Sequence, residues 1–239
     1  MVTLAPALSE MVLALGAQER LVGVTRFDDD PRTRELPRIG GYNDPQPEAV
    51  LALRPDLALA EPAPANRGPV VTVARMGVPV EAFPLSTVAD IEQAVEGIAQ
   101  LLGVMPRGRA LIEELEASRA RARSAAAGKP RVRALLVFGL EPLVVAGTTG
   151  FAGELLADAG GDNAAAATGE KPFFRLSAEA AVHARPDVIV LCGVDAPPGR
   201  APLPGLEKIR VARLRSTALM HPGPRLAEAL DDLAAALRP

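Results

Sequence analysis

Cysteine, histidine, tyrosine and tryptophan are almost missing from this chain. The single cysteine, Cys192, has no partner for an intrachain disulfide, which fits the cytoplasm and equally an envelope in which disulfides are not used. Two histidines and one cysteine leave few choices of metal ligand, general base or nucleophile. No metal site is therefore expected. Because the chain holds only six Phe, one Tyr and no Trp, an aromatic side chain near a pocket is stronger evidence for a ligand contact than it would be in a typical chain.

Long apolar runs and an excess of basic residues are also missing. No run of about eighteen apolar residues is free of charge, so no transmembrane helix is expected. The apolar segment Met1–Ala17 lacks a basic start and is interrupted by Pro6 and Glu10, which favours a strand, a turn and a helix over a secretory signal. The net charge of -3 gives no reason to expect nucleic acid as a partner. We expect a cytoplasmic protein, or one whose export segment lies outside this chain.

Short apolar runs alternate with helical patterns along the whole chain. This alternation predicts an α/β fold with parallel, mostly buried sheets that are covered by helices. No glycine-rich phosphate loop follows an expected strand. The expected strands form two sets: Val2–Leu4, Leu21–Val24, Leu57–Ala60, Val70–Val73 and Val80–Ala82, then Val132–Phe138, Leu143–Val145, Val188–Leu191 and Val211–Leu214.

A long helical stretch separates the two sets of strands. Val88–Leu102 carries apolar residues at helical spacing, and Gly103 can end that helix. Arg107–Ala127, rich in Ala, Glu and Arg, predicts a second helix of about 20 residues and roughly 30 Å. Its far half, Ser118–Ser124, is nearly all Arg, Ala and Ser and is expected to be exposed.

We interpret this second helix as a rigid strut between two lobes. The predicted division is an N-terminal lobe over residues 1–103, an interlobe helix over 104–128 and a C-terminal lobe over 129–239. The alternative is an ordinary crossover helix inside one sheet. Pro222–Leu237, with its leucine stripe, predicts a terminal amphipathic helix packed on the second lobe.

Two segments, one in each expected lobe, match each other. In both, a Glu precedes Arg-Pro-Asp by the same spacing and an apolar strand follows: Glu48 leads to Arg54-Pro55-Asp56, and Glu179 leads to Arg185-Pro186-Asp187. Each reads as a short helix with an acid in its first turn, which suits the helix dipole and needs no function in a single copy. The repetition indicates two related lobes and places Glu48 and Glu179 at equivalent surface positions, where paired acids could grip a two-fold symmetric partner.

Several more segments are informative through their order and spacing, although no single one of them is specific for one family. In chain order they are Leu4–Glu10, Leu21–Val24, Leu36–Tyr42, Gly150–Leu156, Ala159–Asn163 and His221–Arg225. With the repeat, they make essentially the whole chain resemble the vitamin B12-binding subfamily of the solute-binding proteins of ABC importers. The resemblance implies the class III periplasmic-binding-protein fold, with two Rossmann-like lobes joined by one long α-helix and a ligand held in the cleft between them.

The resemblance also implies partners and a compartment. Glu48 and Glu179 match the family's docking acids, which meet basic residues on the two permease subunits in the membrane. The protein is then expected to be a monomer in the periplasm or anchored to the cell envelope, with no cofactor beyond its transported ligand. The favoured ligand is a corrinoid such as cobalamin or cobinamide.

Related ligands remain open to different degrees. A zinc or manganese binder would need more than His183 and His221, the only histidines. A haem binder commonly supplies a Tyr or His axial ligand, so Tyr42 keeps haem open, although the Gly40–Pro45 stretch looks more like the corrinoid binders. Siderophore binders often use Trp, which this chain lacks.

The candidate ligand contacts come from loops that follow expected strands. Tyr42 matches an aromatic contact position of the family, and Glu61 stands where some relatives have an aromatic wall. His221 lies where the family often has Arg. A lone Phe such as Phe27 is more often a core residue, and Phe138 is read as core, whereas one of the adjacent Phe173 and Phe174 is expected to form a pocket wall. The full candidate set is Phe27, Tyr42, Glu61, Phe173, Phe174 and His221.

The rival class is a small α/β enzyme, whose site would also lie at the carboxyl ends of strands. Its chemistry is missing from the chain. No Gly-x-Ser-x-Gly elbow is present, and the two histidines are not at metal spacing. No catalytic residue is expected. His183 is read as solvated surface and Cys192 as a small buried apolar group.

Overall fold

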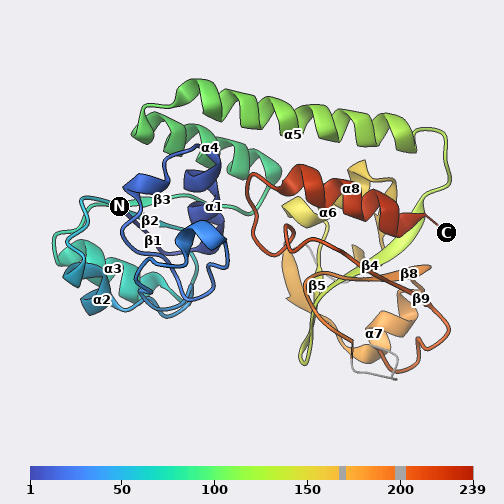
Figure 1. The fold of residues 1–239 in the computed structure, drawn as a ribbon. Helices are drawn as coiled ribbons and strands as arrows, with labels where there is room; N and C mark the ends of the chain where they lie inside the picture. Colours follow the sequence, from blue (N-terminus) through green and yellow to red (C-terminus); the bar gives the residue numbers. More distant parts are fainter. Residues whose placement is uncertain (167–170, 197–202, 239) are drawn as a thin grey trace. The chain divides into compact units, whose positions relative to one another are not determined.

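The chain forms two compact α/β units in a computed structural model that describes residues 1–166, 171–196 and 203–238 (Figure 1). The first unit comprises Met1–Leu85 and Ala89–Ile112, and the second comprises Ser86–Val88 and Glu113–Pro239. The long helix expected from the sequence is present as α5 (Met105–Ala126). It is divided between the two units at Ile112 and Glu113 rather than standing apart from both.

The first unit contains a three-stranded parallel sheet in the order β1-β2-β3. Its strands are β1 (Val2–Thr3), β2 (Ala58–Ala60) and β3 (Val80–Ala82), with Val2 opposite Ala58 and Ala58 opposite Val80. Figure 1 shows α1 (Pro6–Ala14) and α4 (Val88–Leu102) on one face of this sheet and α2 (Pro47–Ala52) and α3 (Arg67–Arg75) on the other. Burial of apolar side chains between these layers stabilises the unit. One cluster of them is Val2, Leu4, Ile39, Val50, Ala58, Ala60, Val73 and Val78.

Two predicted strands of the first unit are wrong. Val70–Val73 lies inside α3, where Val73 is buried while Val71 is 40% exposed. The run of β-branched residues suggested a strand, but tertiary packing of one helical face outweighs that weak local preference. Leu21–Val24 makes only isolated bridges, from Gly23 to Val2 and from Val24 to Arg38. The two bridges join adjacent residues to different partners, so no continuous strand forms there.

The second unit contains a mixed six-stranded sheet. Its path is β7-β5-β4-β8-β9, and β6 also pairs with β4. The strands are β4 (Val132–Leu140), β5 (Leu143–Ala146), β6 (Gly161–Asn163), β7 (Phe173–Arg175), β8 (Val188–Leu191) and β9 (Arg210–Arg213). β4, β6, β8 and β9 are parallel, whereas β5 runs antiparallel to both β4 and β7. The hairpin between β4 and β5 is too short for a crossover helix, so these two neighbouring strands must be antiparallel.

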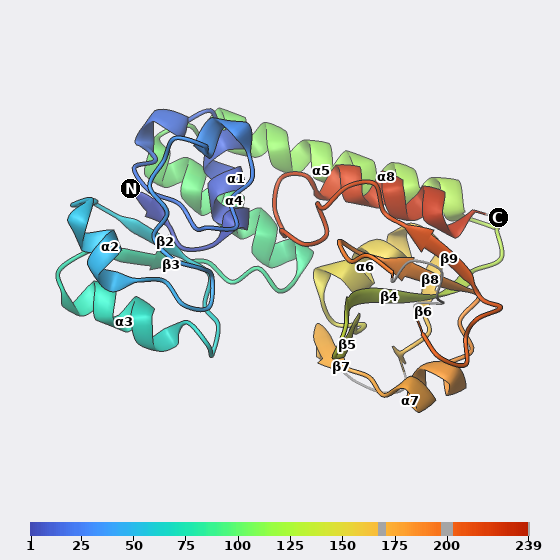
Figure 2. The same ribbon diagram turned by 60° about the horizontal axis from the view of Figure 1, so that its bottom comes forward.

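Helices cover both faces of this second sheet, as Figure 2 shows. α6 (Phe151–Asp158) and α8 (Leu226–Leu237) lie on one face, together with the second half of α5, and α7 (Ala178–His183) lies on the other. The helices expected at Val88–Leu102 and near the C-terminus are confirmed, although α8 starts at Leu226 rather than Pro222. Two 3-10 turns, Gln18–Arg20 and Pro31–Thr33, complete the regular structure of the first unit. Within the described part of the chain, no helix is both long and apolar enough to cross a membrane.

Candidate functional site

The internal repeat has the same backbone conformation in both units. α2 and α7 each span six residues, and each is followed within two residues by an arginine with positive φ, 47° at Arg54 and 45° at Arg185. A left-handed conformation costs a residue other than glycine roughly 1–2 kcal/mol, so chance agreement is improbable. The following Pro-Asp then leads into β2 in one unit and β8 in the other. The two matching segments are therefore the same helix–turn–strand element.

Glu48 and Glu179 occupy equivalent places in this element. Each lies in the first turn of its helix and each is exposed to solvent. Ser177 caps α7, because its hydroxyl accepts the amide of Ala180 at 3.1 Å. A carboxylate in this position is stabilised by the positive end of the helix dipole and stays free to meet a cation.

Phe27 is exposed at the surface of the first unit, contrary to the interpretation that a lone Phe there belongs to the core. Its side chain is 53% exposed, and the guanidinium carbon of Arg26 lies 5.0 Å from the ring centroid. Arg26 is in turn held by Asp44, whose two carboxylate oxygens lie 2.7 and 2.9 Å from its Nη2. Sequence reasoning missed both Arg26 and Asp44. They lie 18 residues apart in different loops, so no local pattern pairs them.

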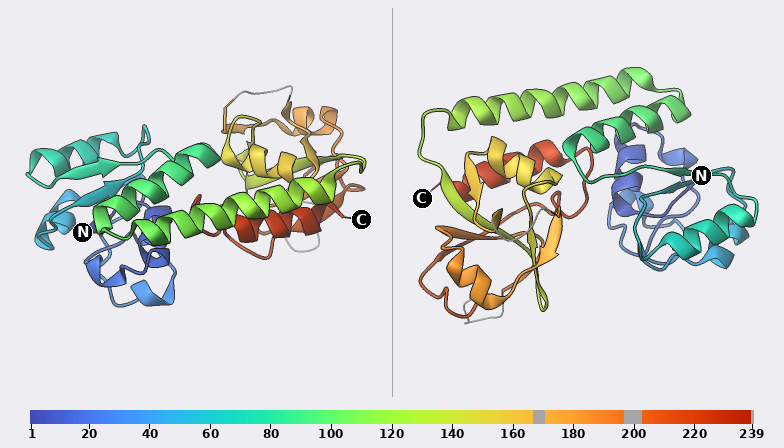
Figure 3. Two further views of the ribbon diagram at one scale, coloured as in Figure 1. Left: turned by 90° about the horizontal axis from the view of Figure 1, so that it is seen from above. Right: turned by 180° about the vertical axis from the view of Figure 1, so that it is seen from behind.

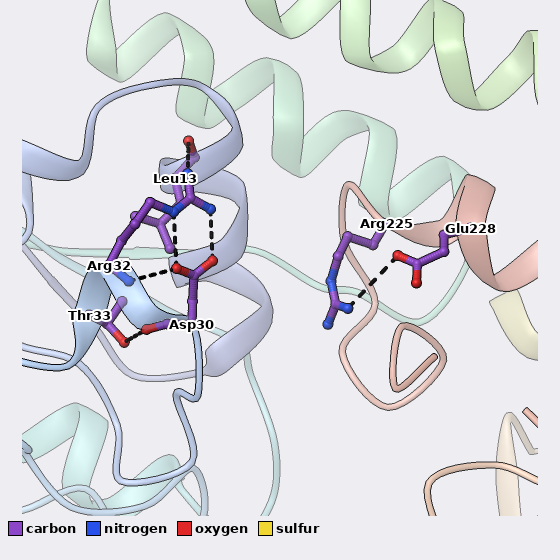
Figure 4. Close-up of polar contacts among 6 residues, drawn as sticks. All are labelled: Leu13, Asp30, Arg32, Thr33, Arg225 and Glu228. Carbon is purple, nitrogen blue, oxygen red and sulfur yellow. Dashed lines mark hydrogen bonds and ion pairs between the residues drawn. The ribbon is translucent and has the colours of Figure 1, made fainter. Parts of the chain in front are cut away.

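The loop that carries Phe27 is fixed by two aspartates, of which Figure 4 shows Asp30 with Arg32 and Thr33. The buried Asp28 accepts the amide and the hydroxyl of Thr25 at 2.8 and 2.6 Å. Asp30 accepts Nε and Nη2 of Arg32 at 3.0 and 2.7 Å, while Nη1 of Arg32 donates to the carbonyl of Leu13. Burial raises the pKa of Asp28 above its ordinary value, although hydrogen bonds to it act in the opposite direction. These hydrogen bonds hold the loop in one conformation.

Tyr42 and Glu61, both predicted ligand contacts, lie close enough in the first unit for each side chain to shift the pKa of the other. Both side chains are half-buried. Burial raises the pKa of Tyr42 above its ordinary value, and the negative charge of Glu61 raises it further. Burial also raises the pKa of Glu61 to about 7, partly offset by the hydrogen bond from Tyr42. Both effects on Tyr42 act in the same direction and favour its neutral phenol form.

The loop after β2 positions Glu61 through a buried amide. Asn66 donates from Nδ2 to the carbonyl of Glu61 at 2.9 Å, and its Oδ1 accepts the amide of Ala63 at 3.1 Å. Asn66 is almost completely buried. Two hydrogen bonds from one buried side chain hold the start of this loop in a single conformation.

The second unit carries an aromatic cluster at β7. Phe173 lies edge-on to Phe138, with ring centroids 4.8 Å apart, and 5.8 Å from Phe151. Phe174 instead packs against the hydrophobic core, because neighbouring side chains of a strand point to opposite faces. Phe138 is only partly buried. Of the two adjacent phenylalanines, Phe173 is the one on the face away from that core.

His221 lies half-buried between β9 and α8. Near it in sequence, Arg225 approaches Glu228 at 3.9 Å (Figure 4) and Thr217 Oγ1 at 3.5 Å, and sequence reasoning did not single out this arginine. His183 is exposed and Cys192 is buried, both as predicted. Burial raises the pKa of the Cys192 thiol well above its ordinary value. Among residues 1–166, 171–196 and 203–238, no group of three or more His, Cys, Asp or Glu could hold a metal ion.

Two surface hollows of the second unit are distinct from the predicted ligand contacts. One, of about 420 Å³, lies on α7 and is lined by Glu179, His183 and Arg133 among others. The other, of about 430 Å³, is lined mainly by alanines of α5, by Gly160 and by the end of α8. Neither is lined by Phe173, Phe174 or His221.

Comparisons with known proteins agree with this geometry. A family model described as periplasmic binding protein matches residues 1–196. The vitamin B12-binding protein of Vibrio parahaemolyticus serotype O3:K6 is 26% identical over 97% of this chain and 86% of its own length. The apo structure of the periplasmic heme-binding protein RhuT from Roseiflexus sp. RS-1 is 31% identical, with a TM-score of 0.81 over 99% of this chain and 96% of that one. The vitamin B12 binding protein BtuF of Vibrio cholerae shares the fold, with 23% identity, a TM-score of 0.82 and coverage of 99% and 95%.

Proposed function

Since the chain belongs to the periplasmic binding protein family, we propose that it binds a corrinoid, such as cobalamin or cobinamide, and delivers it to an ABC importer. Members of this family carry small molecules to ABC permeases and do not catalyse a reaction. The alternative interpretation as a small α/β enzyme is therefore set aside. The choice of a corrinoid within the family is the proposal, and it rests on the residues of the first unit.

The Tyr42–Glu61 pair is the observation that carries this choice. A tyrosine that ligates haem iron does so as an oxygen anion, which a neighbouring carboxylate opposes. Burial and Glu61 both raise the pKa of Tyr42, which disfavours the phenolate form in the free protein. A corrinoid makes no such demand, because its amide arms need hydrogen-bond donors and acceptors and its apolar rim needs an aromatic wall. Tyr42 and Glu61 can supply both.

The exposed aromatic side chain of Phe27 supports the same proposal. The ring of Phe27 is 53% exposed and so offers an apolar wall to a ligand. Arg26 and Asp44 hold the ring in place through the cation–π contact and the paired carboxylate. The curated relative from Vibrio parahaemolyticus is named for vitamin B12, which agrees with a corrinoid ligand. We propose Phe27, Tyr42 and Glu61 on the first unit, and Phe173 and His221 on the second, as its contacts. Phe174 is left out because it packs against the hydrophobic core.

Haem is the second candidate, because the solved structure with 31% identity is a heme-binding protein and because this chain keeps one tyrosine, Tyr42, at a predicted contact. The two ligands differ in what they require of that residue. Haem requires the phenolate of Tyr42 on the iron, whereas a corrinoid requires only the ring and the hydroxyl of Tyr42.

Titration of the purified protein with cyanocobalamin in a calorimeter tests the proposal. We expect saturation at one ligand per chain with Kd of about 1 μM or below, which corresponds to roughly -8 kcal/mol or better. Haemin, titrated in parallel and followed by its Soret absorbance, is the matched comparison. Absence of heat with both cyanocobalamin and cobinamide, or a tyrosine-ligated haemin spectrum at equal protein concentration, would overturn the corrinoid assignment.

The docking role and the compartment belong to the same proposal. We place Glu48 and Glu179 against basic side chains of the two permease subunits, where charge-assisted hydrogen bonds form readily. We expect the working protein to be a monomer in the periplasm or on the cell envelope, as the family name indicates, with no resident cofactor besides its ligand.

A further inference from the structure

Three residues around the start of α4 belong to the second unit, although the chain on either side of them belongs to the first. Residues Met1–Leu85 belong to the first unit, Ser86–Val88 to the second, and Ala89–Ile112 to the first again. The chain enters the second unit finally within α5, at Glu113. The segment Ser86–Val88 and the second half of α5 are therefore the two places where connections to the first unit are anchored on the second.

One short helix, α6, anchors both of these places. The amide of Phe151 donates to the carbonyl of Ser86 at 2.9 Å, and the amide of Val88 donates to Oε1 of Glu154 at 3.2 Å. Val88 is the first residue of α4, so the carboxylate of Glu154 satisfies one of the amides that a helix start leaves unpaired. α6 thus holds the entry to α4 from outside that helix.

The same carboxylate faces α5 with its other oxygen. Oε2 of Glu154 lies 3.6 Å from Nη2 of Arg119, whose Nε donates to Oδ2 of Asp158 at 2.6 Å. Arg123 adds a contact of 3.2 Å to Oδ1 of Asp158. Figure 3 shows α6 running alongside this half of α5. The expectation that Ser118–Ser124 is exposed is therefore wrong for Ser118, which is buried, and for Arg119, which forms ion pairs with two acids of α6.

These ion pairs are partly buried, so they contribute to the stability of the contact between α5 and α6. The side chain of Asp158 is 9% exposed, that of Arg119 19% and that of Glu154 32%. Fully exposed pairs contribute little, whereas partly buried, hydrogen-bonded pairs cost several times more to break because one charge is left without its partner. Ser118, next to Arg119, is also buried, so the contact between α5 and α6 has an unexposed centre.

We propose that, within the second unit, Glu154 is a latch that couples the start of α4 to α5, so that the contacts of α6 with these two helices loosen together. Its two oxygens serve different elements, one a backbone amide and the other a guanidinium. Disturbing the α5 side must then be felt at Val88, which Arg119 does not contact in any hydrogen bond or ion pair of the described chain. This coupling does not depend on which ligand the protein carries.

Hydrogen exchange of backbone amides tests the latch. In Glu154→Ala, we expect exchange at Val88 and the first turn of α4 to rise about tenfold or more, the factor that corresponds to 1.4 kcal/mol. Arg119→Ala should raise exchange at Val88 as well, by at least about threefold, and the double variant should exceed Glu154→Ala by little. Exchange in β4 and β8 serves as the reference for global stability, and Glu116→Ala, an exposed glutamate on α5, is the matched control.

The proposal is overturned if Arg119→Ala leaves exchange at Val88 at the wild-type rate, or if the two substitutions act independently. If Glu154→Ala does not fold, Glu154→Gln replaces it, because the amide keeps an acceptor for Val88 but loses the charge that faces Arg119. Glu154→Gln should then raise exchange at Val88 about as much as Arg119→Ala does, because both substitutions remove the ion pair, and the Glu154→Gln variant should be insensitive to Arg119→Ala. Sensitivity that persists in this background contradicts the latch.

Discussion

Replacing Glu48 and Glu179 together by alanine is expected to lower ligand uptake through the importer at least about tenfold, while ligand affinity stays unchanged. The reason is geometric. The two acids occupy the same position of a repeated helix–turn–strand element whose backbone agrees down to the positive φ of Arg54 and Arg185. Losing one charged partner of a desolvated interfacial pair commonly costs roughly 2–5 kcal/mol, and here two such pairs are removed.

Single substitutions should lie between the wild type and the double variant. Because the element is repeated, Glu48→Ala and Glu179→Ala should impair uptake to a similar degree if the two permease subunits bind the two glutamates in the same way. The measurement is uptake of labelled ligand into cells or vesicles that contain the cognate importer, with affinity measured separately on the purified protein. Glu113→Ala together with Glu116→Ala, two exposed acids of α5, controls for the loss of two negative charges. Normal uptake by the double docking variant would remove the assigned role of both glutamates.

Tyr42→Ala is expected to weaken corrinoid binding about 30-fold or more, since truncating an aromatic contact at the centre of a binding surface commonly costs 2 kcal/mol or above. The substitution removes both the ring and the hydroxyl that bonds to Glu61. It also leaves the half-buried carboxyl of Glu61, whose pKa is about 7, without that partner. Calorimetry with cyanocobalamin measures the effect, and thermal unfolding of the variant establishes that the fold persists.

Tyr42→Phe separates the contribution of the ring from that of the hydroxyl. It keeps the aromatic wall, so we expect a loss of only about threefold to tenfold, the range of a single hydrogen bond. If haem were the ligand and Tyr42 its axial donor, Tyr42→Phe would be nearly as damaging as Tyr42→Ala and would change the Soret spectrum. Equal affinity of Tyr42→Ala and wild type for cyanocobalamin would show that Tyr42 is not a contact.

Regular elements with strong periodicity were predictable from the sequence. The helix at Val88–Leu102 and the strand at Val188–Leu191 have the predicted bounds, because a continuous apolar stripe or run is bounded by clear turn residues in both cases. The repeat of Glu48 and Glu179 was also readable, since both of its copies lie within short stretches of chain. The strand predicted at Val70–Val73 was wrong, because an apolar run of four residues fits a buried strand and one turn of a helix equally well.

Contacts between distant residues could not be predicted in the same way. The pairing of Arg26 with Asp44 and of Arg119 with Asp158 joins residues 18 and 39 positions apart. Because the chain contains many arginines and many carboxylates, the sequence does not show which carboxylate pairs with which arginine. The antiparallel direction of β5 was missed because alternation of strands with helices predicts only the parallel part of the sheet. The short strands β6 and β7 were not predicted. Exposure of Phe27 depends on how two loops pack, which no local pattern records.

Protection of backbone amides on adding cyanocobalamin is the measurement that bears most directly on this account. The account predicts slower exchange in the loops that carry Phe27, Tyr42 and Glu61 and around Phe173, with α2 and α7 unchanged, because those helices are kept for the permease. Protection confined to α7 and its neighbouring hollow, or none in the Phe27, Tyr42 and Glu61 loops at saturating ligand, would contradict it.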